Sequence, residues 1–227
     1  MENETAQRIS NSISKVYFGI VFLCLIAEIF EKRSMVAIFK PLLIPTIFTM
    51  YFITSSKKYW VYLLALFFAL SSNILLLFTI PKFLVYGSIA VLVFFILAIV
   101  VVFNRVPKIL LLPFIIATIP FLFIFSSLIN LTMTVDSPSF IPSAINGVLL
   151  SVFAGLALSS YVMNDCKSNS WLAISTLLFV VLAFLFTIQK YYLANIAFQP
   201  MSAVVFSFAH YSFYKFVIES EMASEIT

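Results

Sequence analysis

Charged side chains are scarce in this chain of 227 residues. Asp, Glu, Lys and Arg together make up 10% of it, whereas hydrophobic residues make up 63%. An ordinary soluble domain is about one quarter charged and about half apolar. The shortage of charge therefore excludes a typical soluble domain and indicates an integral membrane protein.

Cysteine, histidine and basic clusters are also sparse. The chain has two cysteines, Cys24 inside an apolar run and Cys166 in a polar loop, and a single histidine. Two cysteines at different depths exclude a disulfide framework, and we expect neither a metal site nor a cofactor. No basic cluster exists beyond Lys57 and Lys58, so nucleic-acid binding has no support. The P-loop, G-x-S-x-G, HExxH and CxxC patterns are absent, which leaves no sign of a serine, cysteine or metal hydrolase.

Long apolar runs fill most of the chain, and a bilayer core needs about 20 such residues per helix. We predict an all-α polytopic transmembrane bundle with one domain over residues 15–218. Polar tails at 1–14 and 219–227 flank this domain, and the polar start indicates that no signal peptide is cleaved. The eight predicted spans run roughly over 15–30, 35–54, 59–79, 83–103, 109–128, 142–163, 171–188 and 198–218.

The positions of the prolines predict which spans are straight and which are bent. Pro142 and Pro200 lie near the starts of the sixth and eighth spans, where a helix tolerates proline. Pro113 and Pro120 fall within the fifth span and should kink or break it. A bent fifth helix would open space inside the bundle.

The distribution of Lys and Arg predicts the orientation, because short cytoplasmic loops carry an excess of both. We predict that both termini are cytoplasmic and that the protein lies in a cell inner (plasma) membrane. The eight residues on the predicted cytoplasmic side are Arg8, Lys15, Lys57, Lys58, Arg105, Lys108, Lys167 and Lys215. The four on the opposite side are Lys32, Arg33, Lys82 and Lys190.

Ionisable residues within spans are costly and mark candidate sites. Glu28 near the end of the first span and Lys40 early in the second lie at depths of roughly 4 and 9 Å on the same side. We expect their side chains to meet. One interpretation is that Lys40 receives the phosphate of a lipid beside this pair. The alternatives are a structural ion pair or a lysine that reaches up to the interface.

His210 lies deeper, near the middle of the eighth span. Ser207 and Tyr214 share a helical stripe with it, which could handle protons or bind a polar group. The alternative is a neutral histidine hydrogen-bonded to another helix. Ser72 and Asn73, at the centre of the third span, could bind a substrate, although bridging between helices is the favoured interpretation for these residue types.

The order of these features resembles the lysoplasmalogenase family, the YhhN-like membrane proteins. The likeness is carried by "FKPLLIP" in the second span, "ALSSNILLLF" in the third, "KFLVYG" at the start of the fourth, and "LLFVVLAFLFTIQKY" and "AHYSFYKFVI" in the last two. It covers roughly residues 15–218. The resemblance implies hydrolysis of the vinyl ether bond of a lysoplasmalogen, which needs a proton donor and a delivered water.

The resemblance also implies which residues would form the site. Lys40 matches the family's Lys-Pro lysine, and Tyr211 stands in the place of a tyrosine pair in the eighth helix. The family's two aspartates are replaced, one by Asn73 and the other by Ala183. Asparagine cannot cycle a proton near neutral pH, so the resemblance favours the fold over the reaction.

Three functions therefore stay open. The first is a lysoplasmalogenase-like hydrolase, in which the acids left for catalysis are His210 and Glu28. The second is a non-catalytic lipid-binding, sensor or structural protein. The third is a carrier, which has less support because no inverted repeat is visible. In the first two the partner is a membrane lipid such as a lysophospholipid, and its binding residues are Lys40, Asn73, Tyr211, Ser72 and Ser207.

Overall fold

The computed structural model describes residues 2–78, 80–106, 109–193, 195 and 197–226, with side chains described from residue 12 to residue 223 of these. Lys108 lies outside the described residues, and so does the side chain of Arg8. These two basic residues therefore have no described position in the charge count.

The described chain is all helical, with eight helices, and each is long and apolar enough to cross a membrane. The predicted fold class is confirmed. The helices are α1 (Glu2–Ile29), α2 (Arg33–Thr54), α3 (Trp60–Leu77), α4 (Pro81–Arg105), α5 (Leu111–Thr132), α6 (Phe140–Met163), α7 (Lys167–Tyr191) and α8 (Phe198–Ile226). Helices α1 and α8 continue past the predicted spans into the polar residues at both ends of the chain.

The helices can be compared with the effects predicted for their prolines. Pro142 and Pro200 lie in the first turns of α6 and α8, as predicted. The fifth span was predicted to kink or break, and α5 has no break, because it is continuous helix through Pro120. Pro113 is the third residue of α5, where the backbone N–H has no helical partner in any case, and Pro120 removes only one donor.

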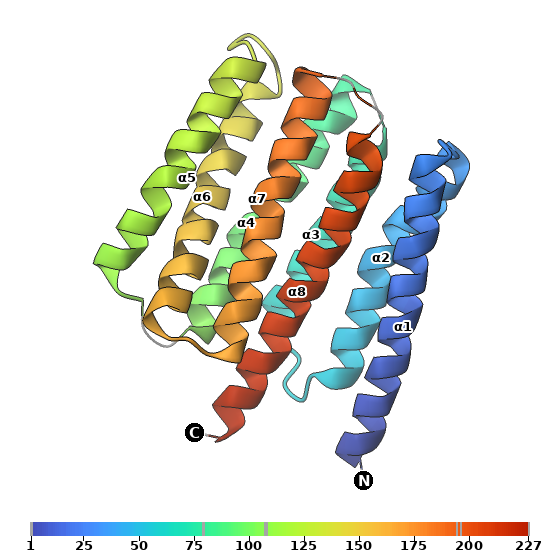
Figure 1. The fold of residues 1–227 in the computed structure, drawn as a ribbon, viewed down its shortest axis with the longest axis vertical. Coiled ribbons are helices and arrows are strands. Elements are labelled where there is room, and N and C mark those ends of the chain that lie inside the picture. The colour runs from blue at the N-terminus through green and yellow to red at the C-terminus, as the bar shows by residue number, and fades with distance from the viewer. Residues whose placement is uncertain (1, 79, 107–108, 194, 196, 227) are drawn as a thin grey trace.

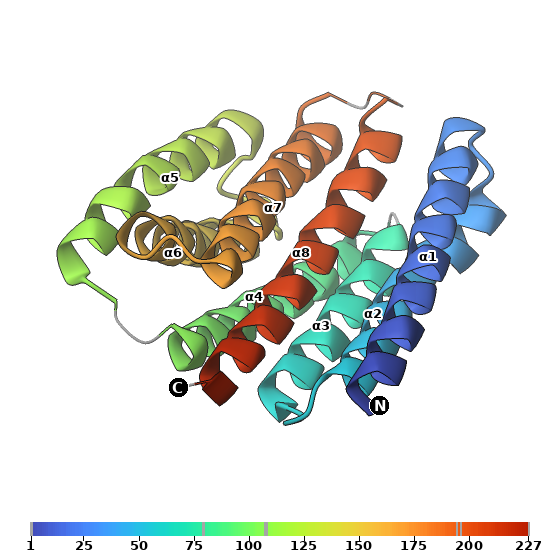
Figure 2. The same cartoon turned by 60° about the horizontal axis from the view of Figure 1, so that its bottom comes forward.

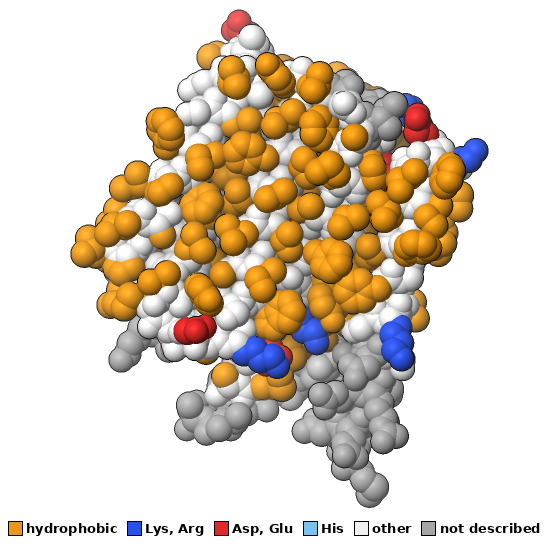
Figure 3. All heavy atoms as spheres, in the orientation of Figure 1, with side chains coloured by type: hydrophobic (Ala, Val, Ile, Leu, Met, Phe, Trp, Pro, Cys, Tyr) orange, Lys and Arg blue, Asp and Glu red, His pale blue; other side chains and the backbone are white. Residues whose placement is uncertain are grey.

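The helices pack as four consecutive antiparallel hairpins (Figures 1 and 2). Across the width of the bundle, α1 and α2 lie at one side and α5 and α6 at the opposite side, with α3, α4, α7 and α8 between them. Both chain termini lie at the same end of the molecule (Figure 1). Apolar side chains cover the visible face between the two ends, and the charged ones gather near those ends (Figure 3). This is the surface that a bilayer requires.

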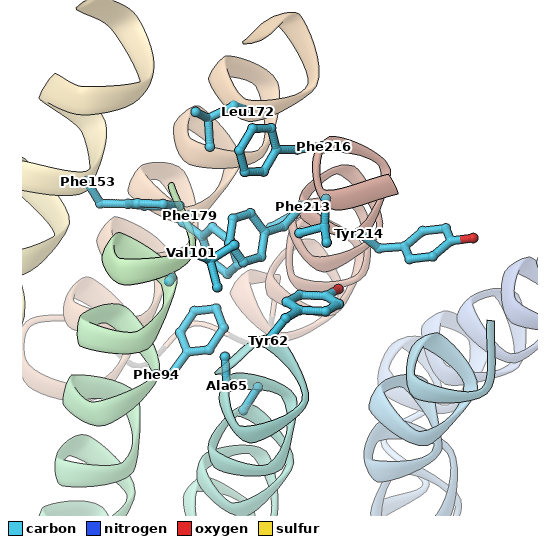
Figure 4. Packing of buried hydrophobic residues seen from close by; sticks show 14 of the residues in the cluster. Tyr62, Ala65, Phe94, Val101, Phe153, Leu172, Phe179, Phe213, Tyr214 and Phe216 are labelled. Atoms are coloured by element: carbon cyan, nitrogen blue, oxygen red, sulfur yellow. The ribbon is translucent and has the colours of Figure 1, made fainter. Parts of the chain in front are cut away.

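An aromatic cluster holds the centre of the bundle together (Figure 4). Phe153 on α6 lies 5.7 Å, centroid to centroid, from Phe213 on α8, and Phe94 on α4 lies 5.4 Å from Phe179 on α7. Tyr62 on α3 contacts Phe213 edge to face at 5.7 Å. All five are at least 97% buried. These rings join five helices and close the middle of the membrane domain.

Candidate functional site

A cavity of about 930 Å³ lies above this cluster, and all eight helices contribute to its wall. Its mouth is at the end of the bundle remote from the chain termini, because Glu28 near the end of α1, Lys190 near the end of α7 and Gln199 near the start of α8 all line it. Phe94 and Phe179 form part of its deep wall. The cavity is therefore charged near its mouth and aromatic at depth.

The predicted meeting of Glu28 and Lys40 is confirmed. Lys40 Nζ lies 3.0 Å from Glu28 Oε1, and the two side chains are 22% and 5% exposed. Two further cations, Arg33 and Lys190, line the same cavity, and neither has an ion-pair partner among the described residues. Lys190 is close enough to Lys40 for their charges to repel. Three cations thus face one carboxylate, which leaves an excess of two positive charges.

Asn73 ties the second and third helices together at this site. Its Nδ2 donates a hydrogen bond of 2.9 Å to the backbone oxygen of Lys40. The bridging interpretation of Asn73 is confirmed, and the same side chain also lines the cavity. The bridging interpretation is wrong for Ser72, whose hydroxyl donates to Ala69 O within α3, although Ser72 also lines the cavity. Both residues shape the wall beside Lys40.

His210 lies deep in the cavity among aromatic rings. Its ring centroid is 4.2 Å from that of Phe206, 4.9 Å from Phe179 and 5.4 Å from Phe94. Its Nδ1 lies 3.0 Å from Phe206 O, so its hydrogen bond stays within α8 and does not reach another helix, contrary to the alternative considered from the sequence. Because a carbonyl oxygen only accepts, Nδ1 carries the proton in this bond. In the neutral ring Nε2 is then an acceptor.

Tyr211 and Ser207 lie on a different side of α8, against α1. The Tyr211 ring stacks on Tyr17 at 5.7 Å and approaches Phe18 at 5.0 Å. Ser207 donates to Ala203 O, and its own backbone oxygen accepts the Tyr17 hydroxyl at 2.7 Å. Neither residue lines the cavity. The residues predicted for the site thus divide: Lys40, Asn73, Ser72, Glu28 and His210 line the cavity, and Tyr211 and Ser207 do not.

Several cavity residues were not singled out from the sequence. Arg33 and Lys190 were counted only as loop charges, and Asn146 on α6 and Ser202 on α8 were not considered. Asn146 donates to Ser88 O, while its Oδ1 and the Ser202 hydroxyl have no hydrogen-bond partner among the described residues. The sequence does show that these polar residues lie near the ends of spans on one side of the membrane. It does not show which helices are neighbours, so it could not predict that they line one cavity.

At the opposite end of the bundle, Glu221 on α8 ties several elements together. Its carboxylate accepts hydrogen bonds from the hydroxyls of Ser55 and Ser56 and from the Lys57 backbone N–H, and it lies 3.6 Å from Arg105. Glu221 is 3% exposed. This network joins α8 to the α2–α3 loop and to the end of α4, and it lines a second, smaller pocket of about 430 Å³ on the side of the termini.

The fold and the cavity define a polytopic helical membrane protein with a central amphipathic pocket. Comparison of the chain with family models, with curated proteins and with solved structures finds no match. The likeness to the lysoplasmalogenases accordingly stays a prediction from the motifs.

Proposed function

We propose that the protein binds a phosphate-bearing single-chain lipid, such as a lysophospholipid, in the central cavity. The observation that carries the proposal is a pair of cations, Arg33 and Lys190, that have no ion-pair partner in the described part of the chain. They lie with Lys40 at the mouth of a pocket with an aromatic wall at depth. Cations that line a cavity without a counter-ion attract an anion, and a bound phosphate forms charge-assisted hydrogen bonds with them.

The two parts of such a ligand match the two parts of the cavity. An arginine fork and two ammonium groups suit a phosphate, which accepts several charge-assisted hydrogen bonds. Below them, Phe94, Phe95 and Leu150 offer an apolar wall for the acyl chain. A free phosphate would leave this wall unused, and a neutral lipid would leave the charges unused.

Binding measurements with purified protein test this proposal. We expect a lysophosphatidate to bind and an uncharged monoacylglycerol of the same chain length to bind much more weakly. Lys190→Gln should weaken lysophosphatidate binding about tenfold, the factor that corresponds to one charge-assisted hydrogen bond. Lys82→Gln is the matched control, because Lys82 is an exposed cation on the same side that does not line the cavity. Equal affinity for the charged and uncharged lipids would refute the proposal.

Vinyl ether hydrolysis is the second candidate, and one observation favours it. Asn73 and Ala183, which stand where the resembled family has its aspartates, line the same cavity. The available acids suit the reaction poorly, because Glu28 is paired with Lys40 and neutral His210 has its proton engaged with Phe206. Protonation of the vinyl carbon needs a free proton donor.

Aldehyde release from a vinyl-ether lysolipid separates the two candidates. We expect none from the parent protein, and release from the double variant Asn73→Asp/Ala183→Asp, which returns both carboxylates to the cavity. Release by the parent that is lost in His210→Ala would instead assign a reaction to His210.

We also propose that the termini face the cytoplasm of a plasma membrane, which places the cavity mouth on the outer side. Support comes from the basic residues with described side chains: six lie toward the termini and four toward the mouth, and Lys40, within α2, is counted for neither side. Protease protection of C-terminal tags in intact cells tests this orientation, and cleavage from outside would refute it. The six are Lys15, Lys57, Lys58, Arg105, Lys167 and Lys215.

A further inference from the structure

The wall of the cavity reaches the outer surface of the bundle between α2 and α3. On α3, an outward stripe at helical spacing is between 39% and 78% exposed and consists of Trp60, Leu64, Phe67, Ile74 and Phe78. Two of these residues, Ile74 and Phe78, also line the cavity. The same side chains therefore belong to the lipid-facing surface and to the pocket.

Helix α2 likewise has residues that line the cavity and are exposed on the outer surface. Ala37 is exposed, Pro41 is half-buried, and both line the cavity. Successive helical turns continue from them to Phe48 and Phe52, which are 41% and 47% exposed on the outer face. Ala37 is small, and Pro41 has no N–H to donate to the Ala37 carbonyl. A free backbone carbonyl within a membrane span is tolerated where it lines a cavity.

Lys40 lies at this junction between α2 and α3, which we call the α2–α3 seam. Ala37 lies about 6 Å below the start of α2 and Ile74 about 5 Å from the end of α3, so the open part of the seam is at one depth. Lys40 is 22% exposed there, and its carbonyl is held from α3 by Asn73. Lys40 is about one helical turn deeper than Ala37, so a phosphate at Lys40 would lie at the inner edge of the open part of the seam, with apolar side chains beside it.

We infer that the α2–α3 seam is a lateral portal through which a phosphate-bearing lipid enters the cavity directly from the bilayer. This inference rests on the proposed function and adds the source of the ligand. A single-chain lipid that entered through water would expose every methylene group of its chain. Through the seam, the chain stays among apolar side chains while the phosphate follows the cations at the mouth.

Kinetics of loading test the portal. The parent protein, Ala37→Trp and the control Ile38→Trp are placed in nanodiscs and mixed with liposomes that contain a fluorescent lysophosphatidate. Ile38 is the matched control, because it neighbours Ala37, is 60% exposed and does not line the cavity. We expect Ala37→Trp to slow both loading and release about tenfold, as a side chain must leave its preferred rotamer for each passage. Ile38→Trp keeps the parent rates.

A second arm distinguishes the membrane from water as the source. Butyl phosphate carries the same charge but reaches the mouth from water, so its rates should be equal in the parent and in Ala37→Trp. Ile74→Trp adds the same bulk from α3, so the outcome does not depend on one variant folding. Unchanged lysophosphatidate rates in both portal variants, or equal slowing of butyl phosphate, would overturn the portal alone. A parent protein that binds neither ligand would overturn the proposed function and the portal with it.

Discussion

Removal of the Lys40 charge should destabilise the protein strongly. In Lys40→Met the Glu28 carboxylate loses the ammonium 3.0 Å away and stays 5% exposed within the membrane domain. Loss of one partner of a buried ion pair costs about 3–5 kcal/mol where no other charge compensates the remaining one. Arg33 and Lys190 line the same cavity as Glu28 and reduce this cost. Lys40 is itself 22% exposed, which places the expected loss at the lower end, about 3 kcal/mol of unfolding free energy.

A double-mutant cycle identifies the cause of that loss. Glu28→Gln/Lys40→Met removes both charges, so it should recover to within about 1 kcal/mol of the parent protein. The measurement is equilibrium unfolding in mixed micelles of increasing denaturing-detergent content. Lys82→Met serves as the control, with an expected change within about 0.5 kcal/mol. If the double variant were as unstable as Lys40→Met, the uncompensated Glu28 charge would not be the reason.

The same variants separate stability from ligand binding. The double variant should be stable and yet bind lysophosphatidate about tenfold more weakly than the parent, since the Lys40 ammonium is gone. Parent-like binding by a stable double variant would show that Lys40 serves only the ion pair.

Two more substitutions test the packing and the Glu221 network. Gly155→Ala should lower the unfolding free energy by about 1–3 kcal/mol, because a Cβ there would lie 2.9 Å from Thr118 Cβ and 3.1 Å from its Cα. Gly19→Ala is the control, since a Cβ there meets nothing within 4 Å, and it should raise the same quantity by up to about 1 kcal/mol. Glu221→Ala should cost about 3 kcal/mol and speed hydrogen exchange of the Lys57 amide, whose acceptor it removes. An unchanged exchange rate would contradict the role of Glu221 in this network.

The helices and the Glu28–Lys40 pair were predictable because both depend on neighbouring stretches of sequence. Apolar runs separated by polar breaks determine where spans begin and end. Glu28 and Lys40 lie on either side of one tight loop, so helical rise alone placed them at similar depths. The loop conformation, with Glu31 at a φ of 52°, was not needed for that prediction.

Which side of each helix faces the cavity was not predictable from the sequence. Ser207 and His210 are three residues apart on one stripe, yet His210 faces the aromatic wall and Ser207 adjoins Tyr17 of α1. The stripe lies on the boundary between two neighbouring helices, and only the packing decides which neighbour each residue contacts. For the same reason Lys190 was not recognised, since its importance depends on α7 lying opposite Lys40.

The position of Lys190 argues that the cation cluster serves binding more than stability. Lys40 is already paired with Glu28, so Lys190 adds a further positive charge to the same cavity. Like charges in a partly buried site destabilise the unliganded protein and become favourable when an anion lies between them. Lys190→Gln should therefore raise the unfolding free energy without ligand by about 1 kcal/mol while it weakens lysophosphatidate binding. Added lysophosphatidate should then stabilise the parent more than the variant, because a ligand raises stability in proportion to its affinity for the folded state. A variant that is less stable than the parent without ligand would mean that Lys190 holds the fold, and the anion site would lose its main support.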